Sequence, residues 1–407
     1  MAPPLATLLV RNLGTLVTCD PERGAVPGVI EGAALAAAGE WICAVGPERE
    51  VAEVALAPDA LVLDALGCTA VPGFVDAHSH LVWLGERSGE YAARAAGSSY
   101  EALAAAGGGI RATVAATAAG GLEELVAGAR PRARRMLLGG TTTVEVKSGY
   151  GLDEDAELRQ LAAAAVLGAD PELPDVLATY LPLHATPEGD RAAFVERVCA
   201  VGVERAAGLA RFVDAFCERG AYTVEECARL LEAGRRHGLG AKLHAEQRSR
   251  SGGARLAARA GAVSADHLEH ASDDDLRALA AAGVTGVILP GASLVLGGPP
   301  PPGRRLLEAG ARVAVATDCN PGTCYSESMP LMVALAVALG GLTPARALVA
   351  ATTGGASALG LHDRGMLRPG MRCDLAILDT PHWLDLGYHL GANPVRTVIR
   401  AGRIAAG

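Results

Sequence analysis

Several histidines of this 407-residue chain have a spacing that suits metal chemistry. His78 and His80 are separated by one residue, so on an extended segment both imidazoles point to the same side and can reach one ion. Such a pair alone is a weak indication. Together with His244 and Asp318 it becomes a strong one, because three imidazoles and one carboxylate, with a water as the remaining ligand, suit Zn²⁺ or Fe²⁺ in a hydrolytic centre.

Short β-like runs, which alternate with segments of helical period, must position these residues. Eight such units over roughly 250 residues predict an α/β fold, a closed (β/α)8 TIM-like barrel whose strands bring their carboxyl ends to one mouth. An open doubly wound sheet is the alternative, but no GxGxxG sequence follows the first run to support it. The predicted strands are Ala70–Ala77, Thr141–Lys147, Val176–Leu183, Arg211–Cys217, Ala241–His244, Val263–His267, Val284–Leu289 and Arg312–Thr317.

The candidate residues fall at the ends of these runs. His78 and His80 follow the first run, His184 follows the third, and Asp318 follows the eighth. The fifth and sixth runs end in His244 and His267. We therefore expect all of them at the mouth of the barrel.

Both ends of the chain have a different pattern from the middle. The first sixty-odd residues and the last forty read as short strands with turns, which predicts one small β-sandwich domain assembled from both termini. We expect the sandwich to take residues 1–68 and 361–407 and the barrel to take residues 69–360. The long connection between residues 77 and 141, which contains Gly107-Gly-Gly109, is expected to carry a binding loop.

Composition limits the classes of partner. A net charge of −9 gives no electrostatic footprint for nucleic acid or for an anionic membrane. The nine cysteines show no CxxC spacing, which favours a reducing compartment, and the amino terminus has no signal-peptide pattern. The longest clean apolar run, Met329–Leu342, is too short to span a bilayer. We expect a soluble cytoplasmic protein.

The chain has two lysines, Lys147 and Lys242, against 34 arginines.

Longer motifs extend the pattern to almost the whole chain. With its metal-ligand residues and its paired terminal β-regions, the chain resembles the amidohydrolase superfamily, and within it the imidazolonepropionases of histidine degradation. The motifs are Pro72-Gly-Phe-Val-Asp-Ala-His-Ser-His80, His80-Leu-Val-Trp-Leu-Gly-Glu-Arg87, Ala106-Gly-Gly-Gly-Ile110, Gly140-Thr-Thr-Thr-Val-Glu-Val-Lys-Ser-Gly-Tyr-Gly-Leu152, Ser264-Ala-Asp-His-Leu268 and Thr317-Asp-Cys-Asn-Pro-Gly-Thr323.

The resemblance implies a reaction and a set of site residues. The reaction is the metal-dependent hydrolysis of the cyclic amide of a small anionic substrate, 4-imidazolone-5-propanoate, to N-formimino-L-glutamate. The resemblance also implies a homodimer. One divalent or trivalent ion per subunit, Zn or Fe, would be held by His78, His80, His244 and Asp318. The residues implied to line the substrate are Arg87, Tyr150, His184, His267, Asn320, Gly322 and Thr323.

Chemistry assigns roles to some of these residues. Asp318 can move a proton from water to the departing ring nitrogen, His267 can hydrogen-bond the developing oxyanion, and Arg87 offers a fork for a carboxylate. Gln247 is expected to contact the substrate as well. It stands where some relatives have a Glu credited with activating the water, and an amide cannot act as a base. Glu246, two residues after His244, is kept as a second candidate base facing the same side.

Two alternatives to this function remain open. Another amidohydrolase, a formimino-glutamate deiminase or a nucleobase-type deaminase, would share the fold, but such enzymes usually have a Glu to protonate the leaving ammonia. A metal-free relative that serves as a scaffold would generally lack metal ligands, and all four are present here. Lys147 is interpreted as a structural or supporting residue rather than as a carbamylated bridge between two metals.

Overall fold

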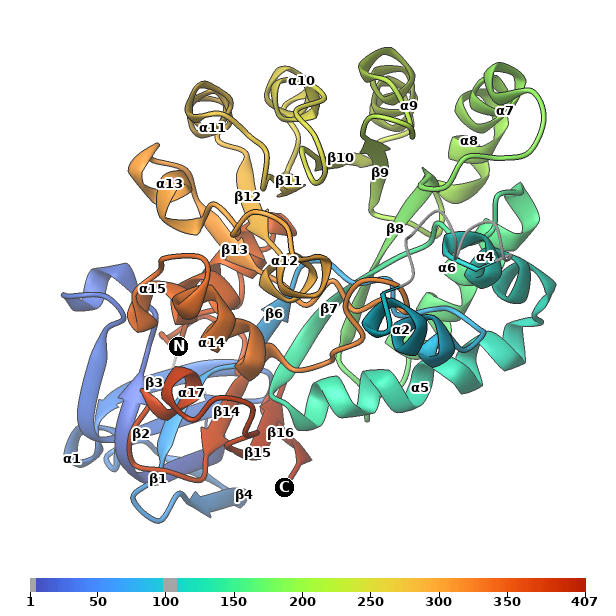
Figure 1. Ribbon diagram of the computed structural model, residues 1–407. Helices are drawn as coiled ribbons and strands as arrows, with labels where there is room; N and C mark the ends of the chain where they lie inside the picture. Colours follow the sequence, from blue (N-terminus) through green and yellow to red (C-terminus); the bar gives the residue numbers. More distant parts are fainter. Residues whose placement is uncertain (1–4, 98–107) are drawn as a thin grey trace.

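The computed structural model describes residues 5–97 and 108–407, and it has two parts. A barrel of strands and helices makes up most of the molecule, and a second sheet contains both ends of the chain (Figure 1). The glycine-rich motif of the long connection lies partly outside the described residues, because Gly107 is not among them.

Eight parallel strands form the barrel sheet in the order of the sequence, as the prediction of a (β/α)8 barrel requires. The sheet is closed at its carboxyl ends by a parallel bridge between Ser79 and Cys319, which follow the first and last strands. The fold class predicted from the sequence is confirmed. The strands are β6 (Phe74–Asp76), β7 (Thr141–Lys147), β8 (Asp175–Leu183), β9 (Phe212–Cys217), β10 (Gly240–Ala245), β11 (Ser264–His267), β12 (Thr285–Ile288) and β13 (Val313–Val315).

The first predicted strand is in fact two strands that belong to different sheets. Thr69–Pro72 forms β5 of the terminal sheet, and only Phe74–Asp76 forms β6 of the barrel. Gly73 lies between them in a crowded position, where a Cβ would stand 2.4 Å from Thr142 Oγ1. The chain therefore passes from one sheet to the other at a glycine, a change that a continuous apolar run does not reveal.

Helices cover the outside of the barrel, and several begin with the caps that their sequences predict (Figure 1). Thr223 and Ser272 each accept a hydrogen bond from the backbone three residues on, and they begin α9 and α11. The acidic run Asp273-Asp-Asp275 forms the first turn of α11. The helices are α1 (Glu48–Val51), α2 (Ser88–Ala95), α4 (Ile110–Ala119), α5 (Leu122–Leu138), α6 (Glu154–Gly168), α7 (Arg191–Arg197), α8 (Val203–Ala206), α9 (Val224–Arg236), α10 (Gly253–Ala260), α11 (Asp273–Ala281), α12 (Pro290–Leu296), α13 (Gly303–Glu308), α14 (Met329–Ala338), α15 (Pro344–Val349), α16 (Gly355–Ala358) and α17 (Asp385–Tyr388).

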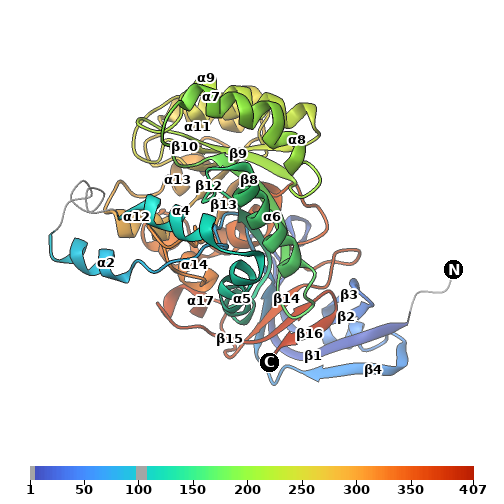
Figure 2. The ribbon, with the colours of Figure 1, turned by 90° about the vertical axis from the view of Figure 1, so that its right-hand side faces the viewer.

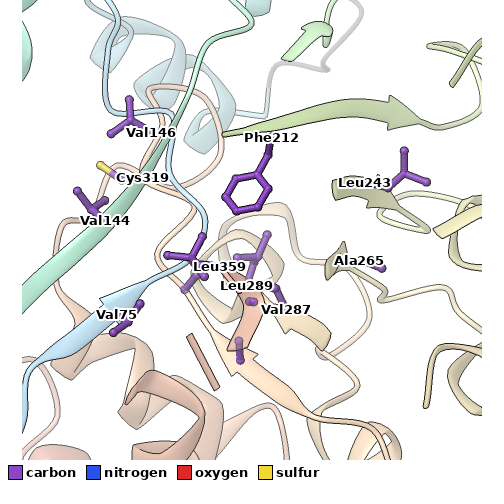
Figure 3. Packing of buried hydrophobic residues seen from close by; sticks show 14 of the residues in the cluster. Val75, Val144, Val146, Phe212, Leu243, Ala265, Val287, Leu289, Cys319 and Leu359 are labelled. Atoms are coloured by element: carbon purple, nitrogen blue, oxygen red, sulfur yellow. The ribbon is translucent and has the colours of Figure 1, made fainter. Parts of the chain in front are cut away.

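Alternation along the barrel strands separates an apolar layer from a charged interior. On β7, Val144 and Val146 belong to the large apolar cluster that the strands share with the helices (Figure 3). The residues between and after them, Glu145 and Lys147, bond to each other and, across the barrel, to side chains of other strands. Burial of the valine face against helices supplies hydrophobic stabilisation, which leaves the inner face free for charged groups.

The terminal sheet is one hydrogen-bonded sheet built from both ends of the chain. Its order is β16-β15-β14-β5-β1-β2-β3, and β4 also pairs with β1. The amino- and carboxyl-terminal strands lie side by side, below the barrel in Figure 1 and at the lower right in Figure 2. Its remaining strands are β1 (Ala6–Val17), β2 (Val29–Ala38), β3 (Trp41–Pro47), β4 (Leu56–Asp64), β14 (Leu375–Leu378), β15 (Val395–Arg400) and β16 (Arg403–Ala406).

An ionic cluster joins this sheet region to the bottom of the barrel. Asp175, at the start of β8, forms ion pairs with Arg364, Arg372 and Arg400 of the carboxyl-terminal segment. These contacts fix the sheet region against the amino-terminal ends of the barrel strands, opposite the predicted site. Within the described ranges, no helix is long and apolar enough to span a bilayer.

Candidate active site

The ends of the barrel strands bring the predicted metal ligands together. The backbone N–H of Asp318 donates to the His78 carbonyl at 3.0 Å, and that of His80 donates to the Cys319 carbonyl at 3.0 Å. These bonds join the first and last strands at the level of the ligands. His244 reaches the same point from β10, on the other side of the barrel.

The four predicted ligands form one buried cluster. Asp318 Oδ1 lies 3.5 Å from both His78 Nε2 and His80 Nε2. His80 Nε2 in turn lies 3.4 Å from His244 Nε2. All four side chains are almost fully buried, and His267 adds a further imidazole within reach of His78 and His244. Three nitrogens and a carboxylate oxygen therefore face one another.

Carboxylates behind the histidines fix the direction of two of the rings. Asp266 Oδ2 lies 2.6 Å from His78 Nδ1, and Asp214 Oδ2 lies 2.9 Å from His244 Nδ1. Nε2 of each ring is thereby directed into the cluster, and His78 Nε2 has no hydrogen-bond partner among the described residues. Carboxylates in this position are the usual support of metal-binding histidines. The donor set fits a divalent cation.

Burial controls the charge of these groups. It lowers the pKa of His78 and His80 well below the ordinary value, with further lowering from Lys147 at His78 and from His184 at His80. Burial also raises the pKa of Asp318 well above its ordinary range. Neutral imidazoles are the form that binds a metal, and a cation would offset the cost of an ionised Asp318.

A cavity of about 540 Å³ opens onto the cluster. Its size is that of a small-molecule site. His80, His244 and Asp318 line it, whereas His78 lies behind them. Every residue expected to contact substrate also lines it: Arg87, Tyr150, His184, Gln247, His267, Asn320, Gly322 and Thr323.

Charged side chains from α2 and its N-cap line part of this cavity. Arg87 Nη2 donates to Glu90 Oε2 at 2.8 Å, and Glu90 Oε1 accepts from the backbone N–H of Gly109 at 2.9 Å. Glu90 therefore holds Arg87 and also ties down the end of the long connection, where Gly109 and Ile110 line the cavity. Sequence reasoning missed Glu90, although its position three residues after Arg87 at the start of a helix was a usable indication.

Close packing explains one glycine of the site. A Cβ on Gly322 would lie 2.7 Å from Arg87 Nη1. The backbone at this point therefore lies against the guanidinium, and a larger residue at position 322 would require the end of the Arg87 side chain to shift. Arg94 Nη2 donates to the Gly322 carbonyl at 3.3 Å, so both arginines contact the same turn.

The loop that carries Tyr150 is held by a buried carboxylate of α6. Glu157 accepts backbone N–H bonds from Gly149 at 2.8 Å and from Gly151 at 2.7 Å. Burial raises the pKa of Glu157 to about 7 against these hydrogen bonds. Gly149 has a φ of +113° and packs against His184, with which Tyr150 also makes a ring contact. Sequence reasoning missed Glu157, because an acidic residue in the first turn of a helix is common: it interacts favourably with the helix dipole.

Asn320 shapes the turn after the last strand. Its Oδ1 accepts from the backbone N–H groups of Gly322 at 2.8 Å and Thr323 at 2.7 Å, and its Nδ2 donates to the Asp318 carbonyl at 2.6 Å. The amide is thus engaged within the turn, as in an Asx turn. Thr323 Oγ1 lies 3.4 Å from Asp318 Oδ2, which places this turn directly beside the metal cluster.

Comparison with known proteins agrees with this geometry. The amidohydrolase family matches residues 69–405. The chain belongs to the amidohydrolase family. An imidazolonepropionase of Deinococcus deserti is 50% identical over 341 residues, which cover 83% of this chain and 84% of that protein. An imidazolonepropionase of Anaeromyxobacter dehalogenans is 45% identical over 416 residues, 99% and 97% of the two chains. The resemblance seen in the motifs is confirmed.

Solved structures of lower identity share the fold of this amidohydrolase. An adenosine deaminase from Xanthomonas campestris with bound zinc has a TM-score of 0.74 and 21% identity, covering 99% of this chain and 93% of its own. An atrazine chlorohydrolase from Arthrobacter aurescens complexed with zinc has a TM-score of 0.70 and 19% identity, covering 98% and 95%. At these identities the likeness concerns the architecture.

One expectation about the amidohydrolase site is wrong. Glu246 does not share the direction of His244, because β10 ends at Ala245 and Glu246 has a φ of +55°. Its carboxylate accepts from Ser251 Oγ at 2.9 Å and from the backbone N–H groups of Gly252 at 3.1 Å and Ala254 at 3.3 Å. Glu246 therefore anchors the start of α10 and does not line the cavity. The alternation of side chains along β10 ends at Ala245, so it does not extend to Glu246 as the prediction required.

A further buried carboxylate, Glu269, lies behind His267. Glu269 Oε2 is 3.8 Å from His267 Nδ1, and its Oε1 accepts from Ser293 Oγ at 2.7 Å. Burial raises the pKa of Glu269 to about 7. Sequence reasoning missed this residue as well. It comes two positions after a strand-ending histidine, and the left-handed backbone at His267 and Leu268 decides where it points.

Proposed function

We propose that this amidohydrolase hydrolyses the cyclic amide of 4-imidazolone-5-propanoate to give N-formimino-L-glutamate in histidine degradation. One observation carries the proposal: a single cavity is lined both by the histidine and carboxylate cluster and by Arg87. The cluster suits a reacting amide, and the guanidinium of Arg87 suits an anionic side chain. The relatives that are named imidazolonepropionase support the same reaction.

The proposed cofactor is one divalent or trivalent metal ion per subunit, zinc or iron. His78, His80, His244 and Asp318 would hold it, since their donor atoms already converge. A cation bound there would supply Lewis acidity and would lower the pKa of water towards about 7.

Arg87 and the residues that line the cavity with it orient the substrate. Arg87 pairs with the propanoate carboxylate through its two-pronged guanidinium, and its contact with Glu90 holds that fork in place. Tyr150 and His184 form an adjoining aromatic wall, their ring centroids 5.4 Å apart. Gln247, Asn320, Gly322 and Thr323 complete the proposed substrate contacts.

Asp318 and His267 carry the proposed proton and charge transfers. As water oxygen bonds to the ring carbonyl carbon, Asp318 accepts the proton that the water gives up. His267 donates a hydrogen bond to the carbonyl oxygen as negative charge develops on it. Asp318 then delivers its proton to the ring nitrogen as the C–N bond breaks, so one water is consumed and the ring opens.

The presence of Gln247 rather than a Glu bears on which group acts as the general base. Its side chain lines the cavity three residues after His244, but an amide cannot accept a proton at neutral pH. With Glu246 engaged at α10, Asp318 is the carboxylate that remains in the cavity beside the reacting position. We assign the proton transfers to it, with His267 in support.

The competing reactions differ in what they need from this cavity. A formimino-glutamate deiminase or a nucleobase-type deaminase needs a group that protonates leaving ammonia, and Gln247 does not provide one. A metal-free scaffold has no need of the buried donor set around Asp318. We further propose a homodimeric enzyme of the cytoplasm with no nucleic-acid or membrane partner. The nine cysteines, all of them free thiols, are consistent with a reducing compartment.

An ultraviolet assay on purified protein of known metal content tests the proposal. Loss of absorbance of freshly made imidazolone propionate, in proportion to about one bound metal per chain and with formimino-glutamate appearing, is expected. No loss from a metal-loaded protein would overturn the substrate assignment and direct attention to the deaminase reactions. A protein that binds neither zinc nor iron would overturn the metal centre itself.

A further inference from the structure

The chain has only two lysines, and both lie inside the barrel beneath the histidine cluster. Lys147 ends β7, Lys242 lies on β10, and both side chains are fully buried. In a chain that otherwise uses arginine for positive charge, two buried ammonium groups in one place call for an explanation. A compact ammonium fits between closely spaced carboxylates where a planar guanidinium does not.

Lys147 contacts the two buried carboxylates that stand behind His78 and His244, and also Glu145. Its Nζ lies 2.8 Å from Asp214 Oδ2, 3.0 Å from Glu145 Oε1 and 3.5 Å from Asp266 Oδ2. Asp214 Oδ2 and Asp266 Oδ2 are the same oxygens that contact His244 and His78. One ammonium thus connects the supports of two metal ligands that come from opposite sides of the barrel.

Lys242 belongs to the same network but has different partners. Its Nζ donates to Glu145 Oε2 at 2.8 Å and to the Ala77 carbonyl at 2.9 Å. Both lysines therefore bond to Glu145, and the charge of each acts on Asp266. Of the two ammonium groups, only that of Lys147 lies within ion-pair distance of Asp214 and Asp266. The two lysines form a matched pair for mutation, because replacing either one removes one buried ammonium. Only the loss of Lys147 removes an ion-pair partner of the carboxylates that contact His78 and His244.

We propose that Lys147 is the positioning residue of the metal centre. Asp214 and Asp266 would repel each other across the barrel without a cation between them. The ammonium sets their separation, and through them it sets the directions of His244 and His78. Two lysines against Glu145, Asp214 and Asp266 leave one negative charge behind the imidazoles, which favours a cation in front of them.

The geometry also assigns the space among these carboxylates to the lysine rather than to a second metal ion. His78, Glu145 and Asp266 lie close enough to hold an ion, but the ammonium of Lys147 already satisfies Glu145 and approaches Asp266. A carbamate on Lys147 would replace that positive charge by a negative one among three carboxylates. The inference rests on the proposed metal centre and makes it a site for one ion.

Metal affinity separates a positioning role from a purely structural one. We would measure Zn²⁺ binding to apoprotein by competition with a chromophoric chelator, and the visible absorption spectrum of the Co²⁺-loaded protein, for Lys147→Met and Lys242→Met. Lys147→Met is expected to weaken Zn²⁺ binding by about 10- to 100-fold and to change the Co²⁺ spectrum. Lys242→Met is expected to keep the affinity within about threefold and to leave the spectrum unchanged.

The outcomes are distinct. Zn²⁺ affinity of Lys147→Met within about threefold of wild type, or equal losses in both variants, would overturn the positioning role. Wild-type protein that binds no metal would instead overturn the proposed function beneath it. Should Lys147→Met fail to fold, Lys147→Met with Glu145→Gln removes one charge of each sign and keeps the buried balance. That double variant is also expected to bind Zn²⁺ weakly, and wild-type affinity in it would overturn the inference.

Discussion

The interior of the barrel and the interior of the terminal sheet are filled in opposite ways. The terminal sheet encloses aliphatic side chains, among them Leu16 and Leu35, that are fully buried. The barrel encloses Glu145, Lys147 and Asp214, which are equally buried but charged. Apolar packing needs only area and fit, whereas buried charges must each find a partner to offset desolvation. Buried charges are thus a less favourable way to hold strands together than apolar packing. They lie in the barrel, where they fix the orientation of the metal-binding histidines.

The comparison predicts that substitutions in the two regions have different consequences. A change at the barrel mouth should affect catalysis and leave folding largely intact. A change in the sheet interior should affect folding and leave catalysis largely intact. Four experiments test this division, taken from the largest expected effect to the smallest.

Asp318→Asn removes the proposed base and one metal ligand at once. We expect turnover to fall by at least about a thousandfold, because both proton transfers pass through this carboxylate. Circular dichroism should show an unchanged fold. Asp379→Asn, the same substitution at an exposed position, is the control. Wild-type turnover by Asp318→Asn would remove its assignment as ligand and base.

Leu35→Ala tests the opposite region. Leu35 is fully buried in the terminal sheet, and we expect its truncation to lower the free energy of unfolding by about 2–5 kcal/mol, from lost transfer energy and the cavity left behind. Urea denaturation measures this loss. The kcat/KM of the folded fraction should stay within about twofold of wild type, since changes away from a site seldom alter it. A large loss of kcat/KM would show that the sheet takes part in shaping the site.

Arg87→Ala tests the proposed contact between Arg87 and the substrate carboxylate. Losing a two-pronged bond to the substrate carboxylate should raise KM by about 10- to 100-fold with a smaller change in kcat. Steady-state kinetics give both quantities. Arg94→Ala is the matched control, because Arg94 lines the same cavity and contacts the same turn at Gly322. Equal effects of the two variants would mean that the carboxylate is not held by Arg87 alone, and an unchanged KM would exclude the clamp.

Asp374→Asn probes a buried carboxyl group beside the terminal sheet. Burial raises its pKa from 3.8 to about 6, against the opposing charge of Arg372. Between about pH 4 and 6 the folded protein therefore keeps a proton that the unfolded chain has released, so stability falls as pH rises. Wild type should lose roughly 1–2 kcal/mol relative to Asp374→Asn across this range and stay level above it.

Urea denaturation at several pH values measures that difference. The kcat/KM of the two proteins should have the same pH profile, because Asp374 lies at the sheet and not in the cavity. A constant difference in stability from pH 4 to 6 would show that Asp374 titrates alike in the folded and unfolded states.

The histidines could be found from the sequence because their spacing follows regular structure. His78, His80, His244 and His267 stand at the ends of strand patterns, and parallel strands bring such ends to one mouth. Glu246 was misplaced for the same reason: alternation was extended one residue past the end of β10, into a left-handed conformation. Prediction by periodicity holds only while the backbone is regular.

The supporting residues could not be found in this way. Glu90, Glu157 and Glu269 lie on helices and turns, where acidic residues are common, and each acts through a contact with a distant part of the chain or with an irregular loop. No local pattern separates Glu157 and Glu269 from solvent-exposed acids, and only the i,i+3 spacing from Arg87 was an indication for Glu90. The split between β5 and β6 at Gly73 was hidden too, because both strands are apolar and adjoining.

The sequence by itself determined the barrel, the terminal sheet and the identity of the candidate ligands, because periodicity and residue type are local properties. Only the tertiary structure decided how the charges pair. Lys147, Asp214 and Asp266 come from three different strands, and their distances depend on how those strands close around the barrel. Electrostatic interactions among buried groups vary steeply with separation and exposure. Such interactions are therefore settled by the packing that brings distant residues together.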